Sequence, residues 1–110
     1  VTQYFFLEDR GKLLENLVFA HLRAQTDELY FLKNGWECDF VAFTTAKQPL
    51  IIQVTERLGS DNLNREIKGL EMAKKRFPNS KGLLLTAEVD QAVDLPDWCD
   101  VMPISTWLLA

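Results

Sequence analysis

The chain has 110 residues, of which 47% are hydrophobic and 25% are charged, and this length and balance predict a single globular domain. Twelve Lys and Arg against sixteen Asp and Glu leave a net charge of −4, which excludes a protein that binds nucleic acid through bulk positive charge. No apolar run approaches the roughly 18 residues of a membrane-spanning helix, and residues 1–10 carry charges but no signal-peptide cleavage site. We therefore expect a cytoplasmic protein with no membrane partner.

Hydrophobic periodicity predicts a series of helices and strands. In chain order they are a helix over 12–25, strands over 29–32, 36–43 and 50–55, a helix from 61 or 62 to 77, strands over 82–86 and 100–104, and a final helical turn capped by Ser105. Asn34-Gly35 is typical of a tight hairpin turn between the first two strands. The order α-β-β-β-α-β-β-α predicts an α/β fold in which helices cover both faces of a mixed sheet of about four or five strands.

Cysteine usage points to an ordinary reducing environment. Cys38, Cys99 and the single His21 make a poor set of zinc ligands, and a disulfide between the two cysteines is the less favoured alternative to free thiols. With no secretory context, we expect both thiols to be reduced and buried. His21 lies in an apolar helical stripe, where a core histidine is the more frequent explanation than a catalytic base.

Polar residues interrupt two of the predicted strands. Because side chains alternate along a strand, the odd-numbered residues from 37 to 43, with Asp39 among them, are expected to share one side. Gln53 should likewise share one side with Ile51 and Thr55. A buried Asp and a buried Gln each require a partner, and the simplest arrangement is a hydrogen bond from Gln53 to Asp39 or Glu15 across the strands.

The spacing of these polar residues is typical of a metal-dependent nuclease. Such sites place an Asp on one antiparallel strand and, about fourteen residues later, an acid-x-Lys triplet on its neighbour, so that the acids hold a divalent cation and the Lys acts on the attacking water. Asp39 and the triplet Gln53-Val54-Thr55 have this spacing. Glu15 lies on the first helix, from which an acid often completes the site. We therefore expect Asp39 and Gln53 to lie on neighbouring strands with their side chains on the same sheet face, and Glu15 to approach them. Alternatively, Glu15 only borders the exposed edge of its helix.

Four segments resemble one large prokaryotic family: residues 11–19 (GKLLENLVF), 37–41 (ECDFV), 51–55 (IIQVT) and 65–67 (REI). They are similar to the C-terminal domain of unknown function that follows the ATPase module in certain bacterial and archaeal AAA-type ATPases. That domain is similar in fold to the PD-(D/E)XK nucleases. The resemblance implies a restriction-endonuclease-like sandwich over 9–110, with residues 1–8 as the tail of a missing upstream ATPase module. It implies that ATP is bound only upstream, and no Gly-rich phosphate loop occurs in these residues.

The chain departs from the family pattern inside the triplet. Gln53 stands where the family has an acid, and Thr55 stands where it has Lys. A Gln oxygen ligates Mg²⁺ without contributing charge, and Thr55 supplies no cation. We therefore interpret Glu15, Asp39, Gln53 and Thr55 as a degenerate catalytic site, in which Glu15, Asp39 and Gln53 would hold Mg²⁺ only weakly. Lys68 could replace the missing Lys, but its helical position predicts that it faces solvent.

Two further groups belong to the second predicted helix. Glu66 lies within the apolar stripe, so we expect it either to join the polar cluster or to pair with Lys74 or Lys33. Arg65, Lys68, Lys75 and Arg76 form a basic face. That face is either a solvated surface or a contact for nucleic-acid phosphates.

These observations support three hypotheses. The leading one is an accessory C-terminal domain of an AAA-type ATPase that cleaves nothing itself and binds nucleic acid or packs on its own ATPase module. The second is an active Mg²⁺-dependent endonuclease. The third is a structural oligomerisation module, in which the apolar residues 1–7 form an interface. The expected partners are therefore the upstream ATPase module, DNA or a second copy of the chain.

Overall fold

The computed structural model describes residues 10–33, 35–44, 48–88 and 94–110. The predicted tail over 1–8 and the hypothetical interface over 1–7 lie outside these residues. The elements are α2 (Arg10–Arg23), β1 (Leu29–Lys33), β2 (Glu37–Ala42), β3 (Leu50–Arg57), α3 (Leu63–Arg76), β4 (Lys81–Glu88), β5 (Cys99–Pro103) and α4 (Ile104–Leu109). No helix in the described ranges is long and apolar enough to cross a membrane.

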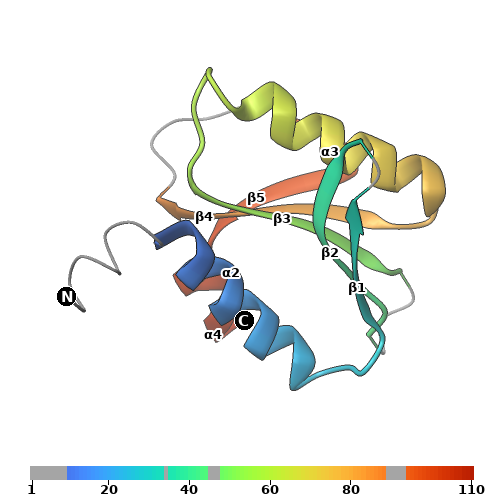
Figure 1. The fold of residues 1–110 in the computed structure, drawn as a ribbon, viewed down its shortest axis with the longest axis vertical. Helices are drawn as coiled ribbons and strands as arrows, with labels where there is room; N and C mark the ends of the chain where they lie inside the picture. Colours follow the sequence, from blue (N-terminus) through green and yellow to red (C-terminus); the bar gives the residue numbers. More distant parts are fainter. Residues whose placement is uncertain (1–9, 34, 45–47, 89–93) are drawn as a thin grey trace.

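The sheet has five strands in the order β1-β2-β3-β4-β5. The pairs β1–β2 and β2–β3 are antiparallel, whereas β3–β4 and β4–β5 are parallel. Helices α2 and α4 cover one face and α3 covers the other (Figure 1). The predicted α/β class, element order and mixed sheet are therefore confirmed.

Each face of the sheet carries its own apolar cluster. On the α2 and α4 side, Val18 and Leu22 pack with Ile52 and Leu85 of the central strands. On the α3 side, the cluster contains Leu70 and Ala73 of the helix and Ile51 and Leu84 of the same two strands. The central strands β3 and β4 are buried on both faces, which explains why their sequences read as almost continuous apolar runs.

Strand β2 contains one extra residue. Tyr30 of β1 pairs with Val41, but Leu32 pairs with Cys38, so two steps on β1 match three on β2. Cys38 and Val41 consequently pack in the α3-side cluster, while Phe40 packs on the α2 side. This bulge breaks the regular alternation, and the prediction that odd-numbered residues from 37 to 43 share one side is wrong.

Two helix ends differ from the predictions. Helix α4 begins at Ile104, and its N-cap is Pro103, whose extended backbone replaces the predicted Ser105 cap. Asn62 does precede α3, but its side chain makes no cap hydrogen bond. Instead it accepts from the Gly59 N–H at 2.9 Å and donates to the Arg57 carbonyl at 2.8 Å, which closes the β3–α3 loop.

Both cysteines are reduced and buried, as predicted. Burial raises the pKa of the Cys38 thiol to about 12 and that of the Cys99 thiol to about 11. Each thiol therefore stays protonated and unreactive in the folded protein.

Candidate functional site

A cleft of about 730 Å³ opens where β2 and β3 stop pairing, between α2 and α3. Its walls bring together residues that are far apart in the sequence. They are Glu15 from α2, Glu37 and Asp39 from β2, Gln53 and Val54 from β3, Arg65, Glu66, Lys68 and Gly69 from α3, and Lys33, Gly35 and Trp36 from the β1–β2 hairpin. The predicted convergence of Glu15, Asp39 and Gln53 on one place is therefore observed.

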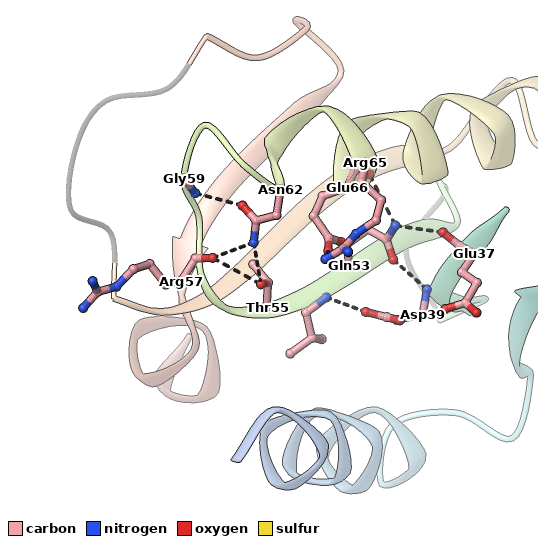
Figure 2. A network of polar contacts seen from close by, with 10 residues as sticks. Glu37, Asp39, Gln53, Thr55, Arg57, Gly59, Asn62, Arg65 and Glu66 are labelled. Atoms are coloured by element: carbon pink, nitrogen blue, oxygen red, sulfur yellow. Dashed lines mark hydrogen bonds and ion pairs between the residues drawn. The ribbon is translucent and has the colours of Figure 1, made fainter. Parts of the chain in front are cut away.

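Gln53 fastens the two strands where their backbone ladder ends. Its Oε1 accepts a hydrogen bond from the Asp39 N–H at 2.8 Å. Its Nε2 donates to the Glu37 carbonyl at 2.9 Å and to the Glu66 carbonyl at 3.3 Å. Figure 2 shows the amide held among these three groups. The side chain is only 3% exposed, and both ends of its amide are engaged by backbone groups.

Asp39 makes the reciprocal contact. Its Oδ2 accepts from the Val54 N–H at 2.8 Å, so each of the two side chains binds the backbone of the opposite strand. The Asp39 carboxylate also accepts a hydrogen bond from the carboxyl group of Glu15. Partial burial, followed by the charge of Asp39 and this hydrogen bond, raises the pKa of Glu15 to about 7. Burial also raises the pKa of Asp39, although the Val54 and Glu15 hydrogen bonds oppose the shift.

Asp39 and Gln53 approach the gap from opposite faces of the sheet. The Asp39 carboxylate lies toward Glu15 of α2, whereas the Gln53 amide lies toward Glu66 of α3. The predicted common face is wrong because the β2 bulge turns Asp39 away from the side of Val41. The predicted Gln53 hydrogen bond to Asp39 does exist, but it is made to the Asp39 backbone rather than to the carboxylate.

Glu66 joins the polar cluster. It is 9% exposed, and its carboxylate pairs with Arg65 at 3.6 Å. Burial, with the charge of Asp39, raises the pKa of Glu66. The alternative partners are engaged elsewhere, since Lys33 pairs with Glu37 at 3.8 Å and Lys74 donates to the Ser80 carbonyl.

Thr55 lies outside the lining of the cleft. Its hydroxyl donates to the Arg57 carbonyl and accepts from the Asn62 amide, both at 3.3 Å. The position that the nuclease pattern assigns to Lys is thus used to organise the β3–α3 loop (Figure 2). His21 is also remote from the cleft: it contacts Gln25 at 3.2 Å, and its ring packs edge-on against Trp107 at 4.6 Å.

The predicted basic face divides into two parts. Arg65 and Lys68 line the cleft, and Lys33 joins them from the hairpin. Lys68 is exposed, as its helical position predicted, and is also part of the cleft lining. Lys75 and Arg76 are exposed near the C-terminal end of α3 and do not line the cleft. Cations from α3 and from the hairpin therefore lie in the cleft lining together with the acidic residues.

Gly69 is a structural requirement of the site that the sequence analysis missed. A Cβ atom added there would collide with the Glu37 carbonyl and with Nε2 of Gln53. The absence of a side chain lets α3 approach the end of β2 closely enough for the Glu66 carbonyl to reach Gln53. An isolated Gly inside a helical pattern was the available signal for this close approach.

The donor set does not fit a Mg²⁺ ion in this arrangement. Mg²⁺ requires near-octahedral oxygen ligands. Oε1 of Gln53 and Oδ2 of Asp39 each accept a backbone N–H, and the pKa of Glu15 is raised to about 7 by burial and by the charge of Asp39, which disfavours its ionised, metal-binding form. Within the described ranges, no group of three or more His, Cys, Asp or Glu side chains is placed to hold a metal ion.

Comparison with known proteins identifies an archaeal relative. Over 75 residues, 64% of this chain, the sequence is 39% identical to an uncharacterized protein of Methanocaldococcus jannaschii. The aligned region spans 17% of that relative, so most of the relative lies outside the similarity. No known protein family and no solved structure matches the chain.

Proposed function

We propose that this chain is a nuclease-like accessory domain of a larger AAA-type ATPase, with a restriction-endonuclease-like fold and a site that has lost cleavage. The observation that carries the proposal is the Gln53 amide, whose oxygen and nitrogen are both taken by backbone groups. A residue with these contacts fastens β2 to β3 and α3. Both polar ends of the amide are thereby directed to the protein backbone instead of to a metal or a reacting water.

The remaining acids support the same conclusion. Burial and the charge of Asp39 raise the pKa of Glu15 to about 7, so the pair carries less than two full negative charges at neutral pH, and position 55 holds Thr instead of a cation. A nuclease of this type requires both the metal-binding charge and a group that acts on the attacking water. We propose that the site keeps Glu15 and Asp39 in the positions of the nuclease acids but has lost both the metal-binding charge and the group that acts on the water.

The basic rim supports binding rather than cleavage. Arg65, Lys68 and Lys33 line the cleft and form its basic rim, and phosphate contacts from a few such cations give weak, salt-sensitive binding. The net charge of −4 restricts such contacts to this rim. We propose that the rim holds nucleic acid that the ATPase module handles, and the alternative is that it packs on the ATPase module itself.

Membership in a longer protein is part of the proposal. The archaeal relative extends far beyond the region of similarity, as expected if the domain is one portion of a larger chain. ATP hydrolysis would then belong to another portion, because the 110 residues contain no phosphate-binding loop.

A cleavage assay on branched and plasmid DNA with Mg²⁺ or Mn²⁺ tests the loss of activity. The wild type is expected to leave the DNA intact. The variant Gln53→Glu with Thr55→Lys restores the missing groups and is compared with Gln53→Glu alone. Metal-dependent cleavage by the wild type that disappears in Asp39→Ala would establish the endonuclease hypothesis and overturn the proposal.

A matched pair of variants tests the rim. Arg65→Glu with Lys68→Glu reverses two charges at the cleft, whereas Lys75→Glu with Arg76→Glu makes the same change on the same helix outside it. Binding to labelled DNA at low salt should be abolished in the first pair and only slightly weakened in the second. Removing one phosphate interaction should reduce the slope of log affinity against log salt by about one. Equal weakening in both pairs would rule out the cleft rim as the binding surface.

A further inference from the structure

The two edges of the sheet are built very differently. Strand β5 carries Asp100, paired with Lys81 at 3.2 Å, and ends at Pro103, and both features discourage a further strand from pairing there. Strand β1 forms the other edge, and no described strand pairs with its outer side. Its sequence has no proline, and Lys33 at its end is its only charge.

The outer edge of β1 is both apolar and available for hydrogen bonding. Tyr30 is 54% exposed and Phe31 is 75% exposed. The Glu28 carbonyl, just before β1, accepts a hydrogen bond at 2.9 Å from the N–H of Phe43, just after β2. The backbone groups of Glu28 therefore point toward β2. Because backbone groups alternate in direction along an antiparallel edge, those of Leu29, Phe31 and Lys33 point away from β2.

A groove lies beside this edge on the α2 side. It has a volume of about 550 Å³, and its aromatic lining is Phe19 of α2, Phe31 of β1 and Phe40 of β2. Helix α2 therefore does not cover the β1 edge, and the view in Figure 1 places β1 at the border of the sheet. The exposed Phe31 side chain is part of this lining.

We propose that β1 is a self-association surface, at which two copies of the chain pair their β1 strands antiparallel about a two-fold axis at Phe31. In this register Phe31 faces Phe31 of the second copy, Tyr30 faces Leu32, and Leu29 faces Lys33. The three residues whose backbone groups point outward then meet one another, so the five-stranded sheet continues into the second copy. The inference is independent of the proposed function.

Charge favours a second copy over an unrelated strand. In this register Lys33 of one copy lies diagonally across from Asp27 of the other. Within one copy Lys33 pairs with Glu37 at 3.8 Å and Asp27 pairs with Arg23 at 2.9 Å, but the two side chains remain 74% and 95% exposed, so each can also reach a second copy. Asp27 precedes the apolar residues of β1 and Lys33 follows them. Two copies of the strand therefore bring opposite charges together only when they run antiparallel. A closed two-fold dimer also covers the exposed edge completely.

The first test is the mass of the chain by analytical ultracentrifugation from micromolar to millimolar concentration. The wild type should form a concentration-dependent dimer, and Phe31→Asp should weaken self-association by about tenfold or more. Leu109→Asp is the matched control, since Leu109 is 89% exposed on α4, and it should leave the dimer unchanged. A monomer at every concentration, or a dimer that is insensitive to Phe31→Asp, would overturn the proposal.

The second test fixes the register. Facing residues of a hydrogen-bonded antiparallel pair have Cα atoms about 5.5 Å apart, which suits a disulfide. Phe31→Cys should therefore cross-link into a covalent dimer under mild oxidation, whereas Tyr30→Cys should not, because Tyr30 faces Leu32. Cross-linking through Tyr30→Cys alone, or equally through Leu109→Cys, would contradict the two-fold axis at Phe31.

Discussion

Asp39 and Gln53 fasten two strands by exchanging backbone contacts, with Oδ2 of Asp39 accepting from Val54 N–H and Oε1 of Gln53 accepting from Asp39 N–H, each at 2.8 Å. These two bonds continue the β2–β3 connection past the last paired residues, Phe40 and Ile52. Side chains thereby replace a backbone ladder at the point where the cleft opens. Substitutions at either residue should therefore affect stability before they affect any chemistry.

Gln53→Glu should destabilise the protein at neutral pH. A carboxylate cannot donate to the Glu37 and Glu66 carbonyls, and it adds charge beside Asp39, so we expect a loss of about 2 kcal/mol or more. Urea denaturation at pH 7 measures it, with Gln48→Glu as the control because Gln48 is exposed. The loss should shrink at pH 5, where the new carboxyl is protonated. Stabilisation of the wild type by Mg²⁺ would contradict the structural role of Gln53.

Asp39→Ala and Asp39→Asn should separate the hydrogen bond from the charge. Alanine leaves the Val54 N–H without its acceptor, and the expected cost is about 1–3 kcal/mol. Asparagine keeps an acceptor oxygen and removes the charge that raises the pKa of Glu15. The asparagine variant should therefore be the more stable of the two in thermal unfolding at neutral pH. Equal losses in both variants would assign the effect to charge instead.

Glu15 should make the protein less stable as the pH rises. Its pKa in the folded state is raised from the ordinary 4.5 to about 7, so the folded state binds the proton more tightly than the unfolded state does. The contribution is complete below pH 4.5 and is lost as the pH rises through about 7. The pKa values of Asp39 and Glu66 are raised as well, and they act in the same direction.

Glu15→Gln tests this dependence, because Gln keeps a donor to Asp39 at every pH. The free energy of unfolding should then vary less between pH 5 and pH 7 than in the wild type. Glu28→Gln is a control on an exposed acid outside the cleft. Identical pH profiles for the wild type and Glu15→Gln would show that the pKa of Glu15 is not raised in the folded state.

Gly69→Ala should be destabilising although alanine is the better helix former. The added Cβ meets the Glu37 carbonyl, which is rigid backbone, and the expected cost is about 1–3 kcal/mol after repacking. Gly11→Ala in α2 is the matched control, since nothing lies within 4 Å of its Cβ position. There the change should be neutral or stabilising by up to about 1 kcal/mol. Chemical denaturation of the two variants decides the matter.

Most of the fold could be predicted from periodicity. The runs at 50–55 and 82–86 are apolar on both faces, and such runs identify central strands. The convergence of Glu15, Asp39 and Gln53 was also predictable, because their spacing matched a known type of site. The face of the sheet on which Asp39 lies could not be predicted. The bulge in β2 depends on how this strand pairs with β1, and the sequence of β2 alone carries no pattern that indicates it.

The partners of Gln53 were predictable only in part. A buried amide must be satisfied, and this requirement correctly indicated a bond toward Asp39. The carbonyls of Glu37 and Glu66 carry no side-chain signature, so no sequence pattern could identify them as acceptors. Thr55 was misplaced for a related reason, since its partner Asn62 was assigned to the helix cap.

The two buried thiols provide natural reporters of how the domain opens. Cys38 lies in β2 beside the cleft, and Cys99 lies at the start of β5 on the opposite edge of the sheet. Because both are protonated and enclosed, a thiol reagent modifies each one only in molecules in which that part of the sheet has separated. The labelling rate of Cys38 reports how often the sheet opens at β2, and the labelling rate of Cys99 reports how often it opens at β5. The ratio of the two rates therefore compares the two parts of the sheet. Equal rates would mean that the sheet unfolds as one cooperative unit.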